Sequence, residues 1–462
     1  MDDVASWRCV RPLVALVAAA ALGTGCAEGV PTESGTLASS ECAPGTSGCL
    51  SVDGSVDIPP GLGDGGDGGG NGNEPGADGA AGAVGTDVDA YDQSAGGADG
   101  ALANDEDPPP RCGGLDADGD GTLDCDDACP HNTNLVEACQ PGRMTLQIDG
   151  AQVPSALVGF PLLVRLSGNA DLALHADLDG MDIYFEDAQG VELPTDIESF
   201  SNGSLVAWVR IDLTGDEQQF VMRYGGGDRR DAADGAGVWD EEFEGVYHLD
   251  GTDDATAHGR NGTDAGGTTA HAAGQLGAAR DFDGNSEIVI GTGLLPGDDD
   301  YTVSFWGRVD YDSGDDPKWA VSSKANTSPY EGFAAGIDKP TGHPLTWNSG
   351  WKLFDTQTVP NLGWVFVVAR VHAASADGYV EFSLDGGPFE RLTFGNTEQQ
   401  RNVAGSALVI GGEGPNTHEN WLGQLDEVRV SSTLRSDAWL QVAHASQRQG
   451  ATLVTAGDHE AL

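Results

Sequence analysis

Apolar and polar residues alternate along the chain from about position 144 onward. Met144, Leu146 and Ile148 are separated by polar residues, which is the period of two expected of a strand with one buried face. Similar segments, and short apolar runs bounded by Gly and Asp, recur through the rest of the chain. Strands are therefore predicted at residues 144–148, 162–166, 181–185, 205–213, 220–224, 287–290, 301–309, 364–371, 379–384, 407–410 and 427–430.

One helix is predicted, at residues 437–445. Ser436 precedes it as an N-cap, whose hydroxyl accepts a hydrogen bond from a free N–H of the first turn, and Trp439 and Val442 lie on one face. A Gly-rich stretch after Gly225 divides the strands into two sets. The predicted fold class is all-β, with a β-sandwich domain at 143–226, a second sandwich at 238–447 and a C-terminal tail at 448–462.

The N-terminal part of the chain does not have this periodicity. Residues 27–110 are rich in Gly, Asp, Ala and Ser and almost free of aromatics, and nine of the ten Trp lie beyond residue 200. Because such a segment cannot bury a core, we expect a disordered, acidic stalk that carries the folded domains outward.

The charge of the chain excludes one class of partner. The net charge is −52, and Arg111 is the only Lys or Arg between Cys26 and Gly142. Phosphate backbones would be repelled along this segment, so nucleic acid is excluded. The acid excess is equally typical of a solvated surface protein, of a saline habitat and of divalent-cation binding.

Residues 1–26 have the pattern of an export signal. Arg8 and Arg11 precede an apolar run at 13–22, which is about half of the roughly 20 residues that a membrane-spanning helix needs. The small residues that end at Cys26 resemble the lipobox of bacterial lipoproteins, although Leu22 stands four residues before the Cys. This resemblance implies export and a lipid anchor on Cys26, in the outer membrane or at the cell surface. The alternative is an ordinary cleaved signal and secretion.

The remaining cysteines predict disulfides. Cys9 would leave with the signal and Cys26 would carry the lipid, so an even number of thiols remains in an exported chain. They all precede the first predicted strand, so the β domains are expected to be held by packing alone. The disulfide candidates are Cys42, Cys49, Cys112, Cys125, Cys129 and Cys139.

An Asp-rich stretch at 116–127 has the ligand spacing of a Ca²⁺ loop. Counted from Asp116, acidic side chains fall at positions one, three, five, nine and twelve, and Gly121 falls at six. Position twelve is Asp rather than Glu, and no helices flank the loop, so this is not an EF-hand. The alternative is chance spacing in an Asp- and Gly-rich stalk. The predicted Ca²⁺ ligands are Asp116, Asp118, Asp120, Thr122 through its carbonyl, Asp124 and Asp127.

Residues 111–142 resemble a single thrombospondin type 3 repeat. The likeness rests on the Asp-rich turns, on the Cys129 and Pro130 pair that ends them, and on Cys112, Cys125 and Cys139. It implies Ca²⁺ bound on a non-helical backbone that disulfides hold in place.

The first β domain, 143–226, resembles a bacterial domain family of unknown function numbered 2341, through residues 160–164, 179–185, 197–200, 205–209 and 222–226. The family implies no activity. We interpret the acidic residues of this domain as a solvated face rather than a site. These are Asp182, Glu186, Asp187 and Glu198.

The second domain, 238–447, resembles laminin-G-like jelly rolls of the concanavalin A type. The likeness rests on residues 246–250, 277–284, 301–306, 363–367, 385–386 and 423–430. It implies a jelly-roll sandwich that binds glycans or extracellular proteins, with Ca²⁺ held by Asp250 and Asp426. The alternative is that Asp426 caps a turn or pairs with Arg429.

Aromatic residues are concentrated between residues 317 and 355, in a stretch rich in Gly and Pro. Aromatic rings supply stacking faces for a sugar, and Asn348 supplies an amide for hydrogen bonds. Aromatic residues in loops equally serve to anchor those loops. The candidate ligand-binding residues are Trp319, Tyr330, His343, Trp347, Asn348 and Trp351.

Two acids at the entry to the second domain raise an enzymatic alternative. Asp240 and Glu242 would lie about 6.6 Å apart on a strand, within the roughly 5–9.5 Å that separates the carboxyl groups of glycosidases. No other catalytic constellation is apparent. We therefore expect a surface-anchored, non-enzymatic binding or adhesion protein. The alternatives are a glycoside hydrolase and a purely structural envelope protein.

Overall fold

The fold is described by a computed structural model of the chain. All described residues belong to one compact unit, Ala101–Leu462. Among them, no helix is long and apolar enough to cross a membrane. The described residues are 116–120, 122, 127, 129–135, 139–226, 230, 232–271, 273–295, 299–311, 318–325, 331–339, 341–348, 350–373, 378–394, 406–413 and 419–462.

Several predicted features lie outside the described residues. They are the export signal with Cys26, the stalk with Cys42 and Cys49, and the site residues Cys112, Asp124, Cys125 and Tyr330.

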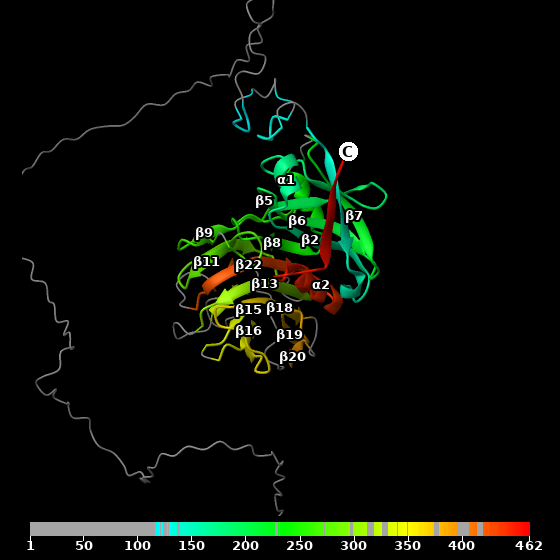
Figure 1. The fold of residues 1–462 in the computed structure, drawn as a ribbon. Coiled ribbons are helices and arrows are strands. Elements are labelled where there is room, and N and C mark those ends of the chain that lie inside the picture. The colour runs from blue at the N-terminus through cyan, green and yellow to red at the C-terminus, as the bar shows by residue number, and fades with distance from the viewer. Residues whose placement is uncertain are drawn as a thin grey trace, which may run out of the picture. The chain divides into compact units, whose positions relative to one another are not determined.

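The first β unit consists of two antiparallel sheets that share a hydrophobic core (Figure 1). Met144, Leu146 and Ile148 point into this core, as their alternation predicts. One sheet has the order β23-β1-β7-β3-β4 and the other β2-β6-β5. Their bounds are β1 Gly142–Ile148, β2 Leu157–Leu166, β3 Tyr184–Glu186, β4 Glu192–Leu193, β5 Thr195–Ser201, β6 Ser204–Leu213, β7 Gln218–Tyr224 and β23 Val454–Ala461, with helix α1 at Ala170–His175 and 3₁₀ turns at Gly150–Gln152 and Ala232–Val238.

The second unit is a sandwich of two larger antiparallel sheets. One has the order β10-β11-β22-β13-β18-β19-β20, with β8 also paired to β22, and the other β17-β16-β15-β14-β21-β12-β9. Their bounds are β8 Phe243–Tyr247, β9 Thr263–Ala265, β10 Thr269–His271, β11 Ala279–Asp283, β12 Glu287–Thr292, β13 Tyr301–Val309, β14 Lys318–Lys324, β15 Gly332–Ile337, β16 Pro344–Asn348, β17 Trp351–Leu353, β18 Trp364–His372, β19 Tyr379–Leu384, β20 Glu390–Thr393, β21 Ala407–Ile410 and β22 Leu422–Ser431.

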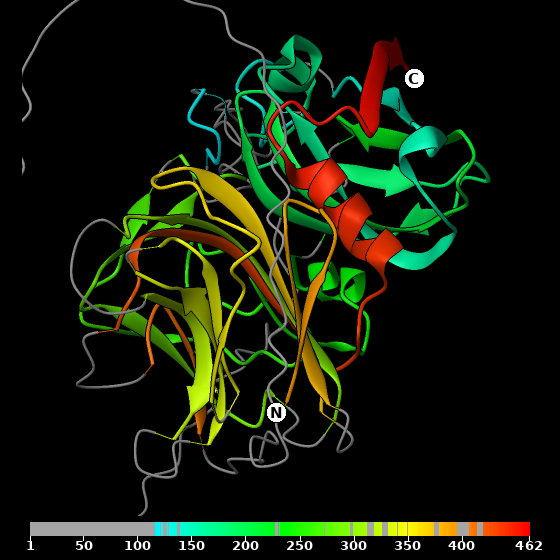
Figure 2. The same cartoon turned by 90° about the horizontal axis from the view of Figure 1, so that it is seen from below.

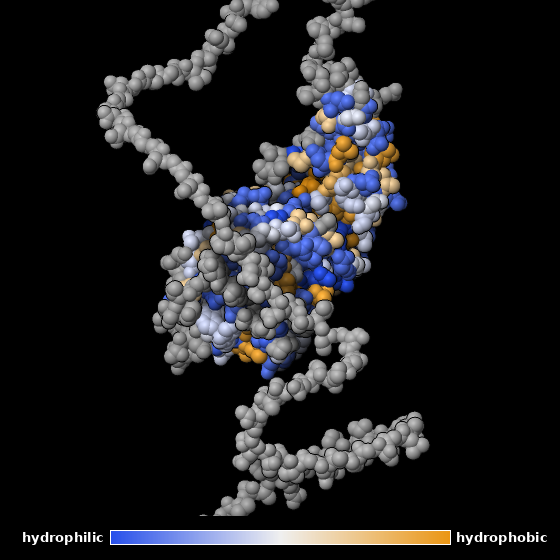
Figure 3. Space-filling model, turned by 90° about the vertical axis from the view of Figure 1, so that its left-hand side faces the viewer, coloured by the Kyte–Doolittle hydropathy of each residue, from blue (hydrophilic) through white to orange (hydrophobic). Residues whose placement is uncertain are grey.

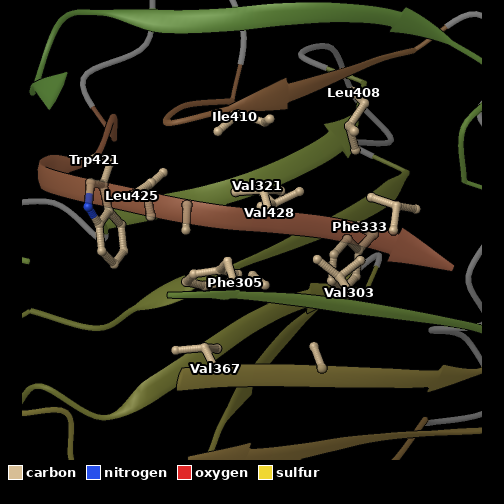
Figure 4. Packing of buried hydrophobic residues seen from close by; sticks show 14 of the residues in the cluster. Val303, Phe305, Val321, Phe333, Val367, Leu408, Ile410, Trp421, Leu425 and Val428 are labelled. Atoms are coloured by element: carbon tan, nitrogen blue, oxygen red, sulfur yellow. The ribbon is translucent and has the colours of Figure 1, made fainter. Parts of the chain in front are cut away.

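Side chains from both sheets interdigitate between them (Figure 4). Phe305 and Val367 from one sheet point toward Val321 and Phe333 from the other. Aromatic rings also meet edge to face across this layer, as Tyr301 and Phe333 do at 5.4 Å. The second unit is thus held by packing, as the absence of cysteine beyond Cys139 requires.

The strand predicted at 181–185 is wrong in its first half, because β3 begins only at Tyr184. Gly180 has a φ of +73°, and the buried carboxylate of Asp182 accepts hydrogen bonds from the backbone N–H groups of Asp177, at 2.9 Å, and Gly225, at 2.5 Å. Asp182 therefore organises a turn and is not part of a solvated face.

The helix predicted at 437–445 is α2, Asp437–Gln447, and Ser436 caps it through the N–H of Trp439. It lies between the two β units (Figure 2). Leu440 and Val442 join the core of the first unit together with Trp306 and Phe366 from the outer face of the second unit. The core of the first unit thus extends onto the outer face of the second unit.

The residues after α2 return to the first unit. The expected tail forms β23, which pairs with β1 along the edge of the sheet (Figure 1). The C-terminal strand therefore closes the unit that begins more than 300 residues earlier in the chain, Met144 facing His459. On the face shown in Figure 3, hydrophobic residues form separate patches among hydrophilic ones.

Candidate functional sites

Three tryptophans of the predicted set meet on the outer face of the second unit. Trp319 lies on β14, Trp347 on β16 and Trp351 on β17. The rings of Trp319 and Trp351 stack at 5.6 Å, and Trp347 meets Trp351 edge to face at 5.1 Å. Trp319 is buried and Trp347 half-buried, whereas Trp351 is 51% exposed. We call these three residues the aromatic platform.

Small residues on β15 make room for the platform. Gly336 pairs with Trp319 and Ala334 pairs with Trp347, so no large side chain stands between the two indoles. A Cβ at Gly336 would lie 2.0 Å from the carbonyl oxygen of Lys318. The platform packs on Ala334 and Leu345 in a cluster separate from the main core.

Charged groups border the aromatic platform. The Lys324 ammonium lies 5.4 Å from the Trp347 ring and 6.0 Å from the Trp319 ring, and it pairs with the carboxylate of Glu413. The indole N–H of Trp319 donates to Glu419 at 2.7 Å. The surface therefore combines an exposed apolar face with hydrogen-bonding groups at its edge.

Two other residues of the predicted set are used differently. His343 Nδ1 lies 2.6 Å from the carbonyl oxygen of Gln357, which ties two loops together. Asn348 is fully buried beside the core residue Phe333, and its amide donates to Thr346. Asn348 alternates with Trp347 and points to the opposite face of the sheet, so it cannot contact a ligand on the platform.

The Asp-rich segment folds as a series of turns that gather its carboxylates. Ligand oxygens of Asp116, Asp118 and Asp120 lie within 4.8 Å of one another. One oxygen of each carboxylate accepts a backbone hydrogen bond from a residue two or three positions ahead. The local sequence thus shapes the cluster through Asx turns.

Three further carboxylate oxygens in the described part of this segment are buried without a hydrogen bond. Asp118 Oδ2, Asp120 Oδ2 and Asp127 Oδ2 are buried and have no hydrogen bond among the described residues. Burial raises the pKa of Asp118, as do the nearby carboxylates of Asp120, Asp127 and Asp116. Unpartnered, like-charged oxygens fit a hard divalent cation, and Ca²⁺ takes oxygen ligands of this kind.

The segment is fastened to the first β unit. Cys129 and Cys139, two of the disulfide candidates, form a disulfide with their Cα atoms 5.1 Å apart. Asn132 Nδ2 donates to the carbonyl oxygens of Leu174 and Ala176, both at 3.2 Å. The residues that follow the Asp-rich stretch are therefore held against helix α1.

A third group of polar residues lies buried where β5 of the first unit meets β22 of the second. His248 Nδ1 lies 2.7 Å from Glu427 Oε1 and 3.6 Å from Glu198 Oε2. The indole N–H of Trp208 also donates to Glu198, at 2.9 Å. We call Glu198, His248, Asp426, Glu427 and Arg429 the joint.

A bulge in β22 turns two consecutive acids toward the first unit. Glu427 and Val428 stand opposite the single residue Phe305 of β13, and Glu427 has a φ of +53°. Leu425 and Val428 point into the core. Asp426 and Glu427 consequently both belong to the opposite, outer side.

The joint balances its charges internally. Burial favours the neutral form of Glu427, but His248 and Arg429 outweigh it and lower its pKa to about 2. Burial, reinforced by the Glu427 carboxylate, raises the pKa of Glu198 to about 8. Burial likewise raises the pKa of Asp426, and Glu427 raises that of His248 against burial. At neutral pH the cations are paired with Glu427, while Glu198 is largely protonated.

The expectation that Glu198 lies on a solvated face is therefore wrong. Its side chain is 1% exposed because the second unit covers β5. Neither Glu198 nor His248 carries a local motif that sequence reasoning could use, since the partner Glu427 lies 179 residues from His248.

The two weaker Ca²⁺ candidates are not brought together. Asp426 is fully buried and accepts a hydrogen bond from the N–H of Leu276. This contact agrees with the alternative that Asp426 caps a turn. Asp250 is exposed and accepts from Gly251. Neither belongs to a three-residue metal-ligating cluster of the described residues.

The acids considered for catalysis lie in a turn before β8 and not on a strand. Arg435 binds both of them, with Nη2 2.7 Å from Asp240 and Nη1 3.0 Å from Glu242. They line an open groove of about 620 Å³ beside Trp239 and Trp439. The arrangement pairs both carboxylates with one guanidinium.

Comparisons with known proteins agree with the sandwich. Residues 282–441 match the family model of the concanavalin A-like lectin/glucanases superfamily. A search of curated proteins finds no match.

Solved structures with detectable likeness include one domain of an enzyme and two toxin binding domains. Domain 4 of an extracellular arabinanase from Geobacillus stearothermophilus, solved with arabinotriose, is 18% identical, covers 43% of this chain and 97% of its own, and has a TM-score of 0.35. The binding domain of Paraclostridial mosquitocidal protein 1 is 13% identical over 45% of this chain and 52% of its own, with a TM-score of 0.33. The receptor-binding domain of botulinum neurotoxin D is 14% identical over 45% and 53%, also with a TM-score of 0.33. By the family match over residues 282–441, the second β unit of this chain is a concanavalin A-like domain.

Proposed function

We propose that this protein is a non-enzymatic binding protein whose concanavalin A-like domain binds a glycan on the aromatic platform. The observation that carries the proposal is Trp351, 51% exposed yet held by ring contacts to Trp319 and Trp347. An exposed indole that is already fixed in orientation loses little conformational entropy when a sugar ring stacks on it.

The border of the platform supports the same ligand class. Lys324, Glu413 and Glu419 place a cation and two carboxylates around the indole faces. Sugars combine apolar C–H faces with many hydroxyls, and a site of few polar groups around an apolar surface matches both. Asp240 and Glu242, by contrast, are engaged by Arg435.

A glycan array probed with the full chain, with and without Ca²⁺, tests the proposal. Hits are then titrated against Trp351→Ala, which is expected to weaken binding at least about tenfold, or about 1.4 kcal/mol. Val191→Ala, an exposed apolar residue of the first unit, is the matched control. Unchanged glycan affinity in Trp351→Ala would contradict binding at the platform. Release of reducing sugar from a hit would favour the glycosidase alternative.

We further propose that the chain is exported and anchored by a lipid on Cys26, so that the platform faces the exterior. The support is the apolar run and the small residues before that cysteine. Metabolic labelling with palmitate should mark the wild type and not Cys26→Ser. Equal labelling of the two would overturn the anchor.

We also propose that the Asp-rich segment binds Ca²⁺. The support is the three buried, unpartnered oxygens of Asp118, Asp120 and Asp127. Calorimetry of the full chain should give a heat of Ca²⁺ binding that Asp118→Asn abolishes, whereas Asp216→Asn in an exposed loop should leave it unchanged. The same heat in both variants would contradict this site.

A further inference from the structure

A second cluster of metal-ligating side chains lies on the first β unit, away from the Asp-rich segment. It combines Asp171 and His175 of α1 with His459 of β23, and their ligand atoms lie within 4.8 Å of one another. Nothing in the proposed glycan-binding function uses these residues.

The fold brings the three together from distant parts of the sequence. Asp171 and His175 are four residues apart on α1, so they share one face of the helix. His459 arrives through the pairing of β23 with β1, where it stands opposite Met144. The two imidazole rings are stacked with centroids 4.9 Å apart and planes 10° apart.

His175 has a nitrogen without a partner. The residue is 8% exposed, and its Nδ1 is buried and has no hydrogen bond among the described residues. A buried polar atom without a partner loses its hydrogen bonds to water and gains none within the protein, which costs on the order of 1–3 kcal/mol of stability. A ligand at this position would satisfy it.

His459 is held in place by its surroundings. Its Nδ1 lies 2.8 Å from Tyr224 Oη, and a Cβ on Gly142 would fall 2.4 Å from its Cε1, so the ring sits against a glycine. When Nδ1 donates its proton to the tyrosine oxygen, Nε2 keeps its lone pair. Metal-bound histidines are oriented by this kind of second hydrogen bond.

We propose that Asp171, His175 and His459 bind a divalent transition-metal ion of the Zn²⁺ class. Two imidazole nitrogens and one carboxylate oxygen suit such an ion, whereas Ca²⁺ takes oxygen ligands. Zn–N bonds of about 2.0–2.1 Å place tetrahedral ligands about 3.3 Å apart. Binding would therefore draw together ligand atoms that now lie within 4.8 Å of one another, and it would turn the two stacked rings out of parallel so that the ion lies in the plane of each. Asp171 and His459 are partly exposed, which leaves a path for the ion and a position for water.

The bound ion would join the C-terminal strand to helix α1. β23 is an edge strand with mostly exposed side chains, and its pairing with β1 is its sheet contact. Binding only to the folded state stabilises that state, so the ion should protect this edge from opening.

The test is a Zn²⁺ titration of the full chain, purified without a histidine tag and competed against a chromophoric chelator. Wild type should bind one equivalent more than His459→Gln, His175→Gln or Asp171→Asn. His271→Gln, which removes a half-exposed histidine elsewhere, should bind as wild type does. Zn²⁺ should raise the melting temperature of wild type and His271→Gln only.

A spectroscopic readout separates this site from adventitious binding. Cu²⁺ bound in place of Zn²⁺ should show coupling to two nitrogens in wild type and to one in His459→Gln. His459→Gln and Asp171→Asn change partly exposed residues, so the test does not depend on the folding of the buried His175→Gln variant. Equal stoichiometry and equal spectra in wild type and His459→Gln would overturn the proposal.

Discussion

The joint and the aromatic platform use the same kinds of residue with opposite exposure. In the joint, the Arg429 guanidinium lies 4.1 Å from the Trp208 ring, and in the platform the Lys324 ammonium lies 5.4 Å from the Trp347 ring. Trp208 is fully buried, whereas Trp347 is half-buried and meets Trp351, which is 51% exposed. Tryptophan beside a cation therefore does not by itself mark a binding surface.

What separates the two regions is whether a neighbouring element covers the sheet. The first unit packs on the outer side of β22 and encloses the joint, so its carboxyl groups bind neighbouring protein groups rather than water. β17 is the terminal strand of its sheet, and the ring of Trp351 stays accessible. The joint is thus suited to hold two units together, and the platform to contact a ligand.

The largest expected effect is in the joint. Glu427→Ala would leave His248 and Arg429 buried without their carboxylate and should cost about 3–5 kcal/mol of unfolding free energy. Glu242→Ala removes a similar arginine-paired carboxylate that is 56% exposed, so it should cost less than about 1 kcal/mol. Urea unfolding of both variants measures the difference, and equal losses would break the comparison.

The second-largest effect is expected in the pH dependence of stability, which the ionisable groups of the joint should govern. The folded chain keeps the Glu198 proton up to a pKa of about 8, against 4.5 when unfolded, so stability is lost as pH rises between these values. Glu427, with a folded pKa of about 2, contributes stability above pH 4.5 that is lost as pH falls toward 2.

Together these two groups predict greatest stability near pH 4–5 and a loss on the order of 5 kcal/mol by pH 9. Glu198→Gln should flatten the alkaline limb, which denaturation across pH 4 to 9 would measure. A variant that keeps the wild-type slope would show that another group causes it.

The smallest effect on stability is expected at the platform. Trp351→Ala should change the unfolding free energy by less than about 1 kcal/mol, because half of the ring is already in water. The same substitution should weaken glycan binding at least about tenfold. A large loss of stability with unchanged binding would mean that Trp351 only anchors β17, and the contrast with the joint would disappear.

Local patterns predicted much of the fold. The bounds of β13, β19 and β21 agree with the strands predicted at 301–309, 379–384 and 407–410, and α2 begins after the Ser436 cap. The spacing of the Asp-rich segment also anticipated the convergence of Asp116, Asp118 and Asp120. In each case the determining contacts lie within a few residues along the chain.

Other features could not be predicted in this way. Asp182 was expected on a surface, but it is buried because it accepts backbone hydrogen bonds from two separate segments. Asn348 was expected to meet a ligand, but its place in β16 turns it toward the core. No strand was predicted at Asn348, so the direction of its side chain stayed open, whereas strand register settles it.

The sequence alone determined the all-β class, the acidic and aperiodic N-terminal segment, and the Asp spacing, because these depend on composition and on neighbours a few residues apart. Only the tertiary structure decided that Glu198 and Glu427 share a buried joint, that β23 returns to β1 with His459, and that three indoles form one surface. Each of these contacts joins residues remote in sequence, and their burial and pKa values follow from what packs against them.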